Sequence, residues 1–292
     1  MTTKSKLQKN TVILDIDFHK PSKERKGDLK NVEVDADQDS LRLTKKFINS
    51  EHYAECERIR TKTKQHIRRF AFDSDHLKDG CYLVPLSTLE DIEPTLKQAQ
   101  ADYAKAADQL AVSWNEIIED AKKRLRSQFN ASNYPSAQSI RRKFWMDWRV
   151  LSYSTPEAST IGEVLYEQEK KKAQDTWQRI EQEVSLAFRQ SFYNLLAHLS
   201  EKLQPTADGS KKVLKQAAVD KVTDFLDTFS RRNVMNDTEM TKLVTQAKKV
   251  LKGKTAEGLK VAKEEIGGKL ATIEKSLGSM IEETKRQFNF ED

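Results

Sequence analysis

A long amphipathic helix is the clearest pattern in the chain, and it covers residues 87–129. Its apolar positions recur every three or four residues, which places them on one helix face, close to a coiled-coil seam. Ser87 and Glu90 form a capping-box pair at its start, and Pro94 either kinks the helix or is its first residue after a short turn. The apolar face is formed by Leu89, Ile92, Leu96, Ala99, Tyr103, Ala106, Leu110, Trp114, Ile117, Ala121 and Leu125.

A second long helix is predicted after Pro156, ending near Leu203. The two helices have similar lengths and about 30 residues join them, so we expect them to pack as an antiparallel pair. The connecting residues 136–153 contain Phe144, Trp145 and Trp148 and would form a tip at one end of the pair. The apolar face of the second helix is formed by Val164, Leu165, Trp177, Ile180, Val184, Phe188, Phe192, Leu195 and Leu199.

The N-terminal part of the chain mixes extended and helical patterns. Residues 11–18 alternate apolar and polar side chains, which predicts a short strand, and residues 80–85 are extended up to a proline. Asp15 and Asp17 in the strand suggest a metal, but a solvated strand face is the favoured interpretation. Residues 19–38 are predicted to be a loop, and residues 39–70 a helix with Cys56 on its apolar face.

The C-terminal part predicts three further helices. The first covers residues 210–230 and the last covers residues 255–288. Between them lies a shorter helix, which Asn236 or Asp237 caps at its start and Gly253 ends. Gly267, Gly268 and Gly278 lie inside the last of them, and each interior glycine costs about 1 kcal/mol.

The predicted fold is mainly α, an elongated bundle built on two long antiparallel helices. A small extended element lies near the N-terminus and a helical subdomain at the C-terminus. The predicted domains are residues 1–38 (strand and loop), 39–204 (a coiled-coil-like long-helix domain with an aromatic-basic tip at 136–153) and 205–292 (the helical subdomain).

Composition supports helices and narrows the class of protein. Charged residues make up 33% of the 292 residues and hydrophobic ones 37%, with 9 Gly and 6 Pro, which fits amphipathic helices better than sheets. No apolar run approaches the length of a membrane span, and no secretory signal is visible. Two cysteines cannot form a disulfide framework and fit a reducing compartment. We therefore expect a cytoplasmic protein.

The net charge of +6 is concentrated in one segment. Residues 41–70 hold nine Lys or Arg and three Glu, which already gives +6. The favoured interpretation is a solvated helix face or a contact with a protein. The alternatives are that the face follows a phosphate backbone or is attracted to anionic lipid. The densest part consists of Arg58, Arg60, Lys62, Lys64, Arg68 and Arg69.

The aromatic-basic tip is the second candidate site for nucleic acid or an acidic partner. Its aromatic rings could stack on bases while its basic side chains hold phosphates. The favoured interpretation is that Trp145 and Trp148 are packed, with the aromatic residues anchoring the turn between the two helices, because large aromatic side chains are usually buried. The candidate residues are Arg141, Arg142, Lys143, Trp145, Trp148 and Arg149.

Enzyme and metal signatures are absent from the sequence. The run from Gly253 to Thr255 lacks the upstream glycine and the strand of a nucleotide-binding loop. His52 and Cys56, with His76 and Cys81, supply zinc-ligand types, but their spacing matches no recognised finger. A buried thiol and surface histidines are the favoured interpretation. We expect no catalytic residue, no metal and no cofactor.

One family resemblance arises in the C-terminal third. The run FLDTFSRRNV at residues 225–234, followed by Asn236, Asp237, Leu243, Val244, Ala247, Leu251 and Gly253, resembles the C-terminal pattern of an uncharacterised bacterial and phage family. The Cys56 helix and residues 80–85 are similar to that family too. The resemblance implies a phage or mobile genetic element in which the gene lies beside a MoxR-type AAA+ ATPase and a von Willebrand factor A-domain protein. It supplies no catalytic residues.

Three functional hypotheses follow. The first is a non-enzymatic interaction protein, acting as adaptor, substrate or scaffold of that AAA+ ATPase system through its helical faces. The second is a nucleic-acid-binding accessory protein that uses the basic helix face. The third is a helical membrane-active protein, against which the lack of a spanning segment counts. Unpartnered apolar faces on long helices also favour a homo-oligomer.

Overall fold

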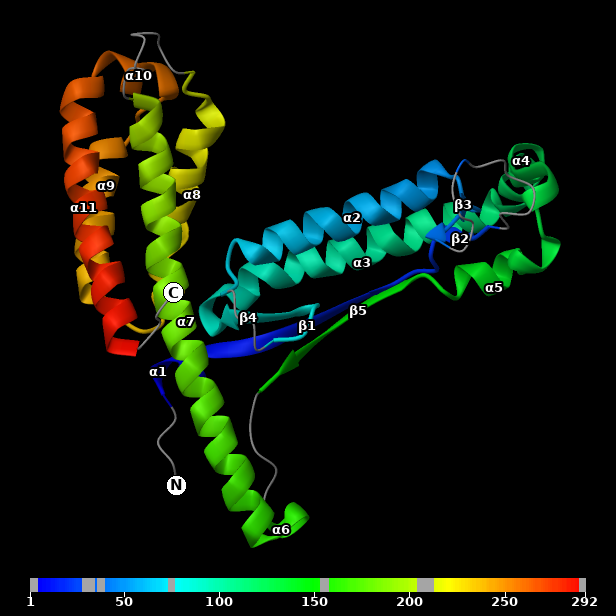
Figure 1. Ribbon diagram of the computed structural model, residues 1–292, viewed down its shortest axis with the longest axis horizontal. Coiled ribbons are helices and arrows are strands. Elements are labelled where there is room, and N and C mark those ends of the chain that lie inside the picture. Colours follow the sequence, from blue (N-terminus) through cyan, green and yellow to red (C-terminus); the bar gives the residue numbers. More distant parts are fainter. Residues whose placement is uncertain are drawn as a thin grey trace. The chain divides into compact units, whose positions relative to one another are not determined.

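The structure is a computed structural model that describes residues 5–27, 35, 40–72, 77–152, 158–203 and 213–288. The chain is mainly helical with a small sheet, as predicted (Figure 1). It divides into two units. The bundle unit comprises Met1–Leu14, Arg68–Leu89 and Val150–Asp292, and the α2–α3 unit comprises Asp15–Ile67 and Glu90–Arg149. These units do not follow the ranges predicted from the sequence, because each is assembled from segments far apart in the chain.

The larger sheet has three strands in the order β4–β1–β5. β1 (Thr11–His19) and β4 (Cys81–Pro85) confirm the two predicted extended segments. β5 (Trp145–Leu151) corrects the predicted tip, because the second half of residues 136–153 is a strand and not a turn between two helices. Its side chains alternate from exposed Trp145 to buried Met146 to exposed Asp147, a period of two that the flanking basic residues concealed.

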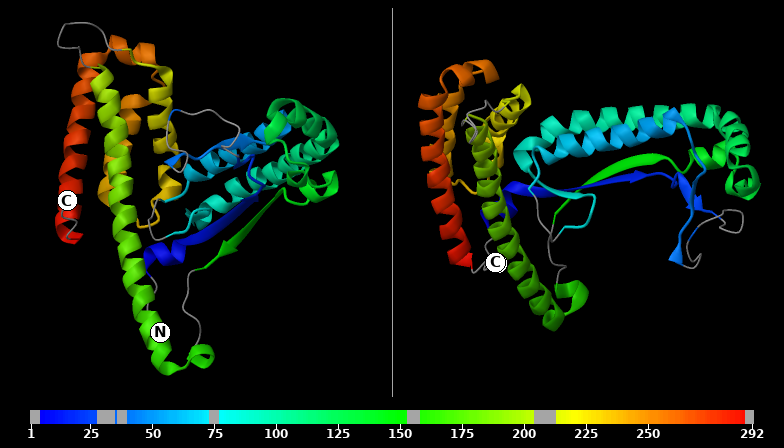
Figure 2. Two further views of the ribbon diagram at one scale, coloured as in Figure 1. Left: turned by 45° about the vertical axis from the view of Figure 1, so that its right-hand side comes forward. Right: turned by 45° about the horizontal axis from the view of Figure 1, so that its top comes forward.

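The α2–α3 unit is built around α2 (Glu51–Arg68) and α3 (Leu89–Val112), which run side by side in both views of Figure 2. It also contains α4 (Trp114–Leu125), the short α5 (Ala137–Arg141) and the antiparallel ribbon of β2 (Glu24–Lys26) and β3 (Thr44–Lys46). The predicted apolar seam is buried on α3 and α4 at Ile92, Leu96, Ala99, Tyr103, Ala106, Leu110, Trp114, Ile117 and Ala121.

Two helix boundaries in this unit differ from the prediction. The helix predicted for residues 87–129 breaks at Ser113, which has φ −81° and ψ 4° and whose hydroxyl donates back to the Gln109 carbonyl at 2.9 Å. Pro94 lies inside α3, so the alternative in which it starts the helix is wrong. α2 begins at Glu51 and not at residue 39, because Phe47 and Ile48 are buried in non-helical backbone before it.

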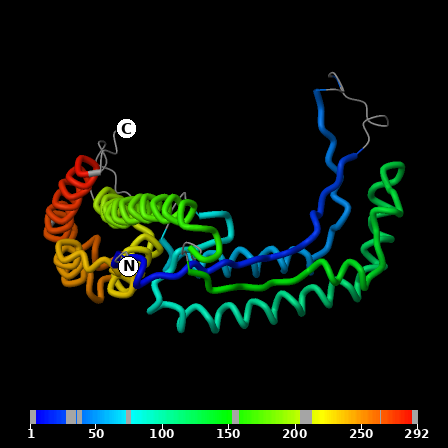
Figure 3. The backbone as a smooth tube through the Cα atoms, turned by 90° about the horizontal axis from the view of Figure 1, so that it is seen from below, coloured from blue at the N-terminus to red at the C-terminus, as the bar shows by residue number. Residues whose placement is uncertain are grey.

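The bundle unit gathers four helices around the C-terminal half of α7 (Glu163–Leu203) (Figure 3). α7 packs along α11 (Lys263–Phe288) and against α8 (Gln216–Arg232), and α9 (Thr238–Leu251) packs on α8 and α11. The short α10 (Ala256–Val261) precedes α11, and α1 (Lys6–Asn10) lies at the start of β1. The core contains Phe188, Phe192, Leu196, Leu199, Val222, Phe225, Phe229, Met240, Leu259, Leu270, Ile273 and Leu277.

The antiparallel pair predicted for the helix at residues 87–129 and the helix after Pro156 is not confirmed. α3 belongs to one unit and α7 to the other, and the long partner of α7 is α11. The two seams have the period expected of paired helices, but a period does not specify which helix is the partner. Among the described helices, none combines the length and the apolarity that crossing a membrane requires.

The interior glycines of α11 give a stability test. A Cβ at Gly267 or Gly268 would meet no atom within 4 Å, so replacing both with alanine is expected to raise the free energy of unfolding by about 1–2 kcal/mol. Gly253 is the matched control, because its φ of +67° is left-handed and Gly253→Ala is expected to cost about 1 kcal/mol. Urea unfolding followed by circular dichroism compares the variants, and changes of the same sign would contradict this.

Candidate functional site

The predicted basic face of α2 divides into two rows. Tyr53, Cys56, Thr63 and Ile67 form the buried stripe of this helix. At about 100° per residue, Arg58 and Lys62 lie opposite that stripe, whereas the remaining basic residues border it. The bordering residues are Arg60, Lys64 and Arg68, of which Arg60 and Lys64 are half-buried. A phosphate backbone would therefore meet two separate rows and not one stripe.

Two of these arginines are already held by carboxylates. Arg58 donates to Glu51 at 2.6 Å and to Glu55 at 2.7 Å, and these hydrogen bonds raise the pKa of its guanidinium. Arg69 forms a two-pronged ion pair with Asp224 of α8, one arm of which is 3.1 Å long. Both positive charges are thereby partly neutralised within the chain, which reduces what they offer to a phosphate.

The basic residues around β5 also divide into those that are paired with carboxylates and those that are not. Arg141 forms an ion pair with Asp108 and donates to the Phe144 carbonyl at 3.0 Å, and Arg149 donates to Asp15 at 3.0 Å. Arg142 and Lys143 are exposed, and no ion pair holds them among the described residues. The positive charge available here therefore belongs to two adjacent side chains.

Among the described tryptophan and phenylalanine residues of this region, Trp145 is the one that is classed as exposed. It is 42% exposed and stacks flat on the His19 ring, with 5.2 Å between ring centroids and an interplanar angle of 2°. His19 is fixed in turn, since its Nδ1 lies 2.6 Å from the Lys143 carbonyl. Trp148 is half-buried and Phe144 is buried. The packed interpretation favoured for Trp145 and Trp148 is therefore wrong for Trp145, and Trp148 is packed only in part.

A charged cluster that sequence reasoning missed joins α2 to the end of β1. Lys20 donates to the Tyr53 hydroxyl at 2.7 Å and to Glu57 at 3.0 Å, and Lys23 donates to Glu57 at 2.9 Å. Burial raises the pKa of Glu57, but the hydrogen bonds from Lys23 and Lys20 outweigh it and hold that pKa below its usual value. A cavity of about 280 Å³ opens beside this cluster, at the start of α2.

The charges of Lys20, Lys23 and Glu57 are paired with one another, so this cluster holds the backbone in place. The hydroxyl of Tyr53 donates to the Pro21 carbonyl at 2.7 Å, so the cluster ties residues 20–23 to α2. Both lysines form ion pairs with Glu57, and this one carboxylate accepts from each of them. The sequence contained little indication of this cluster. Residues 20 and 23 lie in a predicted loop, residues 53 and 57 lie on a predicted helix, and no motif connects the two pairs.

The candidate zinc ligands are not brought together by the described part of the chain. No group of three or more His, Cys, Asp or Glu side chains there could hold a metal ion. Cys56 is fully buried, Cys81 is half-buried, and His76 lies outside the described residues. Burial raises the pKa of Cys56 to about 11, so its thiol stays protonated at neutral pH and is a poor nucleophile.

The buried thiol predicts a loss of stability at high pH. The pKa of Cys56 is about 11 in the folded chain and near 9.0 when exposed, so the unfolded chain releases this proton first. The contribution of the thiol is therefore complete below pH 9 and is lost as the pH rises to 11. Urea unfolding at increasing pH is expected to show the stability gap between wild type and Cys56→Ala narrowing over this window. A constant gap would contradict the assignment.

A groove between α8 and α9 has a volume of about 650 Å³. Its floor is formed by Val219, Leu226 and Leu251, and four exposed lysines lie along its α9 side. Asp220 and Asp227 line the α8 side, which leaves a net charge of two positive units. The lysines are Lys248, Lys249, Lys252 and Lys254, and no described residue forms an ion pair with any of them.

The start of α7 is an arm that lacks a packed face. No residue from 163 to 176 is buried, and the first buried side chain of the helix is Trp177. Val164 is 77% exposed and Leu165 is 45% exposed. The short α6 (Ala158–Ile161) lies against the beginning of this arm through a turn at Gly162, where φ is +82°. We call residues 158–176 the α6–α7 arm.

The motif behind the family resemblance is part of the bundle core. Phe225 and Phe229 stack with Phe192 and Phe188, at centroid distances of 4.9 and 5.6 Å. The Arg232 guanidinium lies 4.9 Å from the centroid of the Phe188 ring. These contacts give the run FLDTFSRRNV a packing role in the described structure, at residues 225–234.

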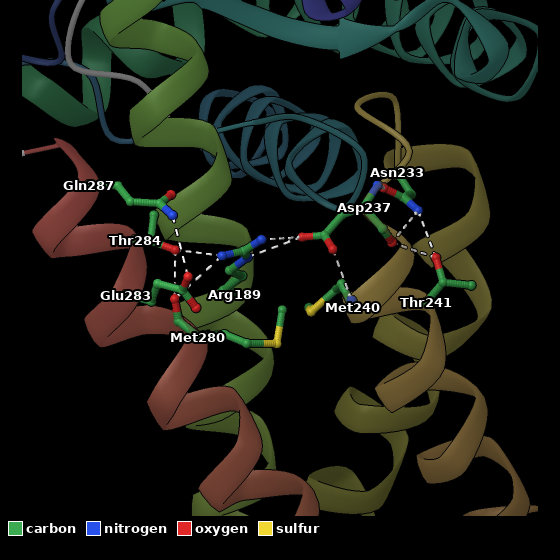
Figure 4. A network of polar contacts seen from close by, with 9 residues as sticks. All are labelled: Arg189, Asn233, Asp237, Met240, Thr241, Met280, Glu283, Thr284 and Gln287. Carbon is green, nitrogen blue, oxygen red and sulfur yellow. Dashed lines mark hydrogen bonds and ion pairs between the residues drawn. The ribbon is translucent and has the colours of Figure 1, made fainter.

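Asp237, further along the same motif, closes a polar network across three helices (Figure 4). It caps α9 by accepting from the Met240 backbone N–H at 3.0 Å and accepts from Arg189 of α7 at 2.7 Å. Arg189 also donates to the Thr284 hydroxyl of α11 at 2.5 Å. This confirms the predicted cap, with Asp237 and not Asn236 as the capping residue.

Comparison with known proteins found no match. No family model, no curated protein and no solved structure matches it.

Proposed function

We propose that this chain is a non-enzymatic interaction protein that acts in the cytoplasm as adaptor, substrate or scaffold of a MoxR-type AAA+ ATPase system in a phage or mobile element. The observation that carries the interaction role is the α6–α7 arm, in which about four helical turns lack a packed face and Val164 is 77% exposed. Apolar side chains held out on a helix favour contact with another protein. The ATPase and a von Willebrand factor A-domain protein as partners rest on the resemblance of residues 225–253.

The test is affinity purification of the tagged chain from its native host, without nuclease. Stoichiometric recovery of a AAA+ ATPase would support the proposal, and its loss with Val164→Glu would place the contact on the arm. Val112→Glu is the matched control, since Val112 is 87% exposed at the end of α3. Recovery of no ATPase would count against the proposal. The purified chain alone is expected to hydrolyse no ATP.

Nucleic-acid binding is the second candidate, and the exposed Trp145 favours it. A flat ring stacked on His19 beside Arg142 and Lys143 offers an aromatic face next to positive charge. Asp147 is also exposed on β5, and its negative charge would repel a phosphate there. For this reason nucleic-acid binding is the second candidate and not the first.

Salt dependence tests this second candidate. Binding of labelled single-stranded DNA or RNA, measured by fluorescence anisotropy, is expected to weaken steeply with salt. Trp145→Ala is expected to weaken it by roughly tenfold, and Arg142→Ala with Lys143→Ala to flatten the salt slope. Arg58→Ala is the control, because its charge is already paired with Glu51 and Glu55. Salt-insensitive binding, or none, would remove this candidate.

A further inference from the structure

The α6–α7 arm and the α8–α9 groove have complementary chemistry. The tip of the arm, residues 158–169, carries Glu163, Glu167 and Glu169 and no basic residue, although three lysines follow it directly at residues 170–172. The groove has four lysines that form no ion pair with a described residue. Glu167 and Glu169 do pair with Lys170 and Lys172, but these are exposed contacts three residues apart and are easily exchanged.

Apolar surfaces match in the same way. Ile161, Val164 and Leu165 lie within the tip, and the last two are exposed. The floor of the groove is formed by the apolar side chains of Val219, Leu226 and Leu251, at the bottom of an open volume of about 650 Å³. These three side chains are themselves at most 5% exposed, so the apolar gain comes from the arm: a helix that places Val164 and Leu165 in the groove, with its carboxylates beside the lysines, removes those two exposed side chains from water.

The arm of one chain cannot fill its own groove. α7 has 41 residues, so it is about 60 Å long as a rigid helix, with the arm at its first end. The opposite end, around Leu203, shares a core with Val219, Leu251 and Ala256, next to the groove. Figure 1 shows α6 and α10 at opposite ends of the bundle unit. The occupant must come from another molecule.

We propose that the arm of one copy of this chain docks in the α8–α9 groove of a second copy. Because arm and groove lie at opposite ends of α7, two copies placed antiparallel bring each arm to the partner's groove. The contact is then made twice and closes into a dimer with twofold symmetry. This inference uses the same arm as the interaction role proposed above, so a second copy and an ATPase would compete for it. It is tested on the purified chain alone, so its failure is distinguishable from failure of the ATPase proposal.

The experiment is light scattering of the purified full chain over a range of concentrations. Wild type is expected to be a dimer whose dissociation constant rises with salt. Val164→Glu with Leu165→Glu, in the arm, is expected to raise that constant by roughly tenfold or more. Val112→Glu, at an equally exposed valine outside both surfaces, is expected to leave it unchanged. Circular dichroism checks that each variant is folded.

Charge exchange identifies the two surfaces as partners. Lys248→Glu with Lys249→Glu is expected to break the dimer, and so is Glu163→Lys with Glu167→Lys. Combining all four substitutions in one chain is expected to restore it, because the attraction is reversed and not removed. A wild-type chain that is monomeric at every concentration would overturn the proposal. So would a dimer that neither the arm nor the groove substitutions weaken.

Discussion

Arg189→Ala is expected to lower the free energy of unfolding by about 3 kcal/mol, because it leaves a mostly buried carboxylate without its partner. The Arg189 side chain is 21% exposed and that of Asp237 is 16% exposed, so water compensates little for the lost contact. The same guanidinium donates to the Thr284 hydroxyl and to the Met280 carbonyl, which joins α7 to α11 (Figure 4). Urea unfolding followed by far-ultraviolet circular dichroism measures the change.

Two variants separate the network from a simple loss of charge. Arg179→Ala removes an exposed arginine from the same helix and is expected to change stability by less than about 0.5 kcal/mol. Asp237→Asn keeps a side chain that caps α9 but removes the negative charge. The double variant with Arg189→Ala is expected to lose less than the sum of the two single changes. If Arg189→Ala were no more destabilising than Arg179→Ala, the network would not stabilise the bundle.

Phe192→Ala is expected to cost about 4 kcal/mol, the largest effect of a single core truncation in the bundle unit. The side chain is fully buried and stacks on Phe225, with 4.9 Å between ring centroids and an angle of 3°. Removing the ring leaves a cavity between α7 and α8 in addition to the lost apolar burial. The same unfolding measurement gives the value.

Controls for this truncation vary the size of the cavity and the burial. Phe192→Leu retains most of the buried volume and is expected to cost about half as much or less. Val261→Ala removes an 89% exposed side chain of the same unit and is expected to have almost no effect. A cost for Phe192→Ala below about 1 kcal/mol would mean that the surrounding helices close the space.

The existence of most elements could be predicted because it depends on near neighbours in the chain. The seam from Ile92 to Ala121 is buried as its period predicted, and the alternation of residues 11–18 is strand β1. The predicted helix boundaries were wrong where the local sequence pattern was compatible with more than one structure. The sequence pattern placed Phe47 and Ile48 in α2, but they are buried in non-helical backbone, and the helix begins at Glu51.

The candidate site was predictable as composition and not as geometry. The positions of Arg58, Arg141 and Arg149 were identified correctly, but whether each charge is available depends on Glu51, Asp108 and Asp15. Two of these carboxylates lie 33 and 134 residues away in the chain. No local pattern connects residues at such separations.

By itself, the sequence determined a helical, basic chain with its apolar stripes, its caps and its two short extended segments. Each of these follows from contacts within a few residues, such as Asp237 with Met240. Only the tertiary structure decided that α7 pairs with α11, that Arg189 joins three helices and that α8 and α9 leave a groove. Partner choice between helices depends on how whole side-chain surfaces fit, and helices of similar period have similar stripes.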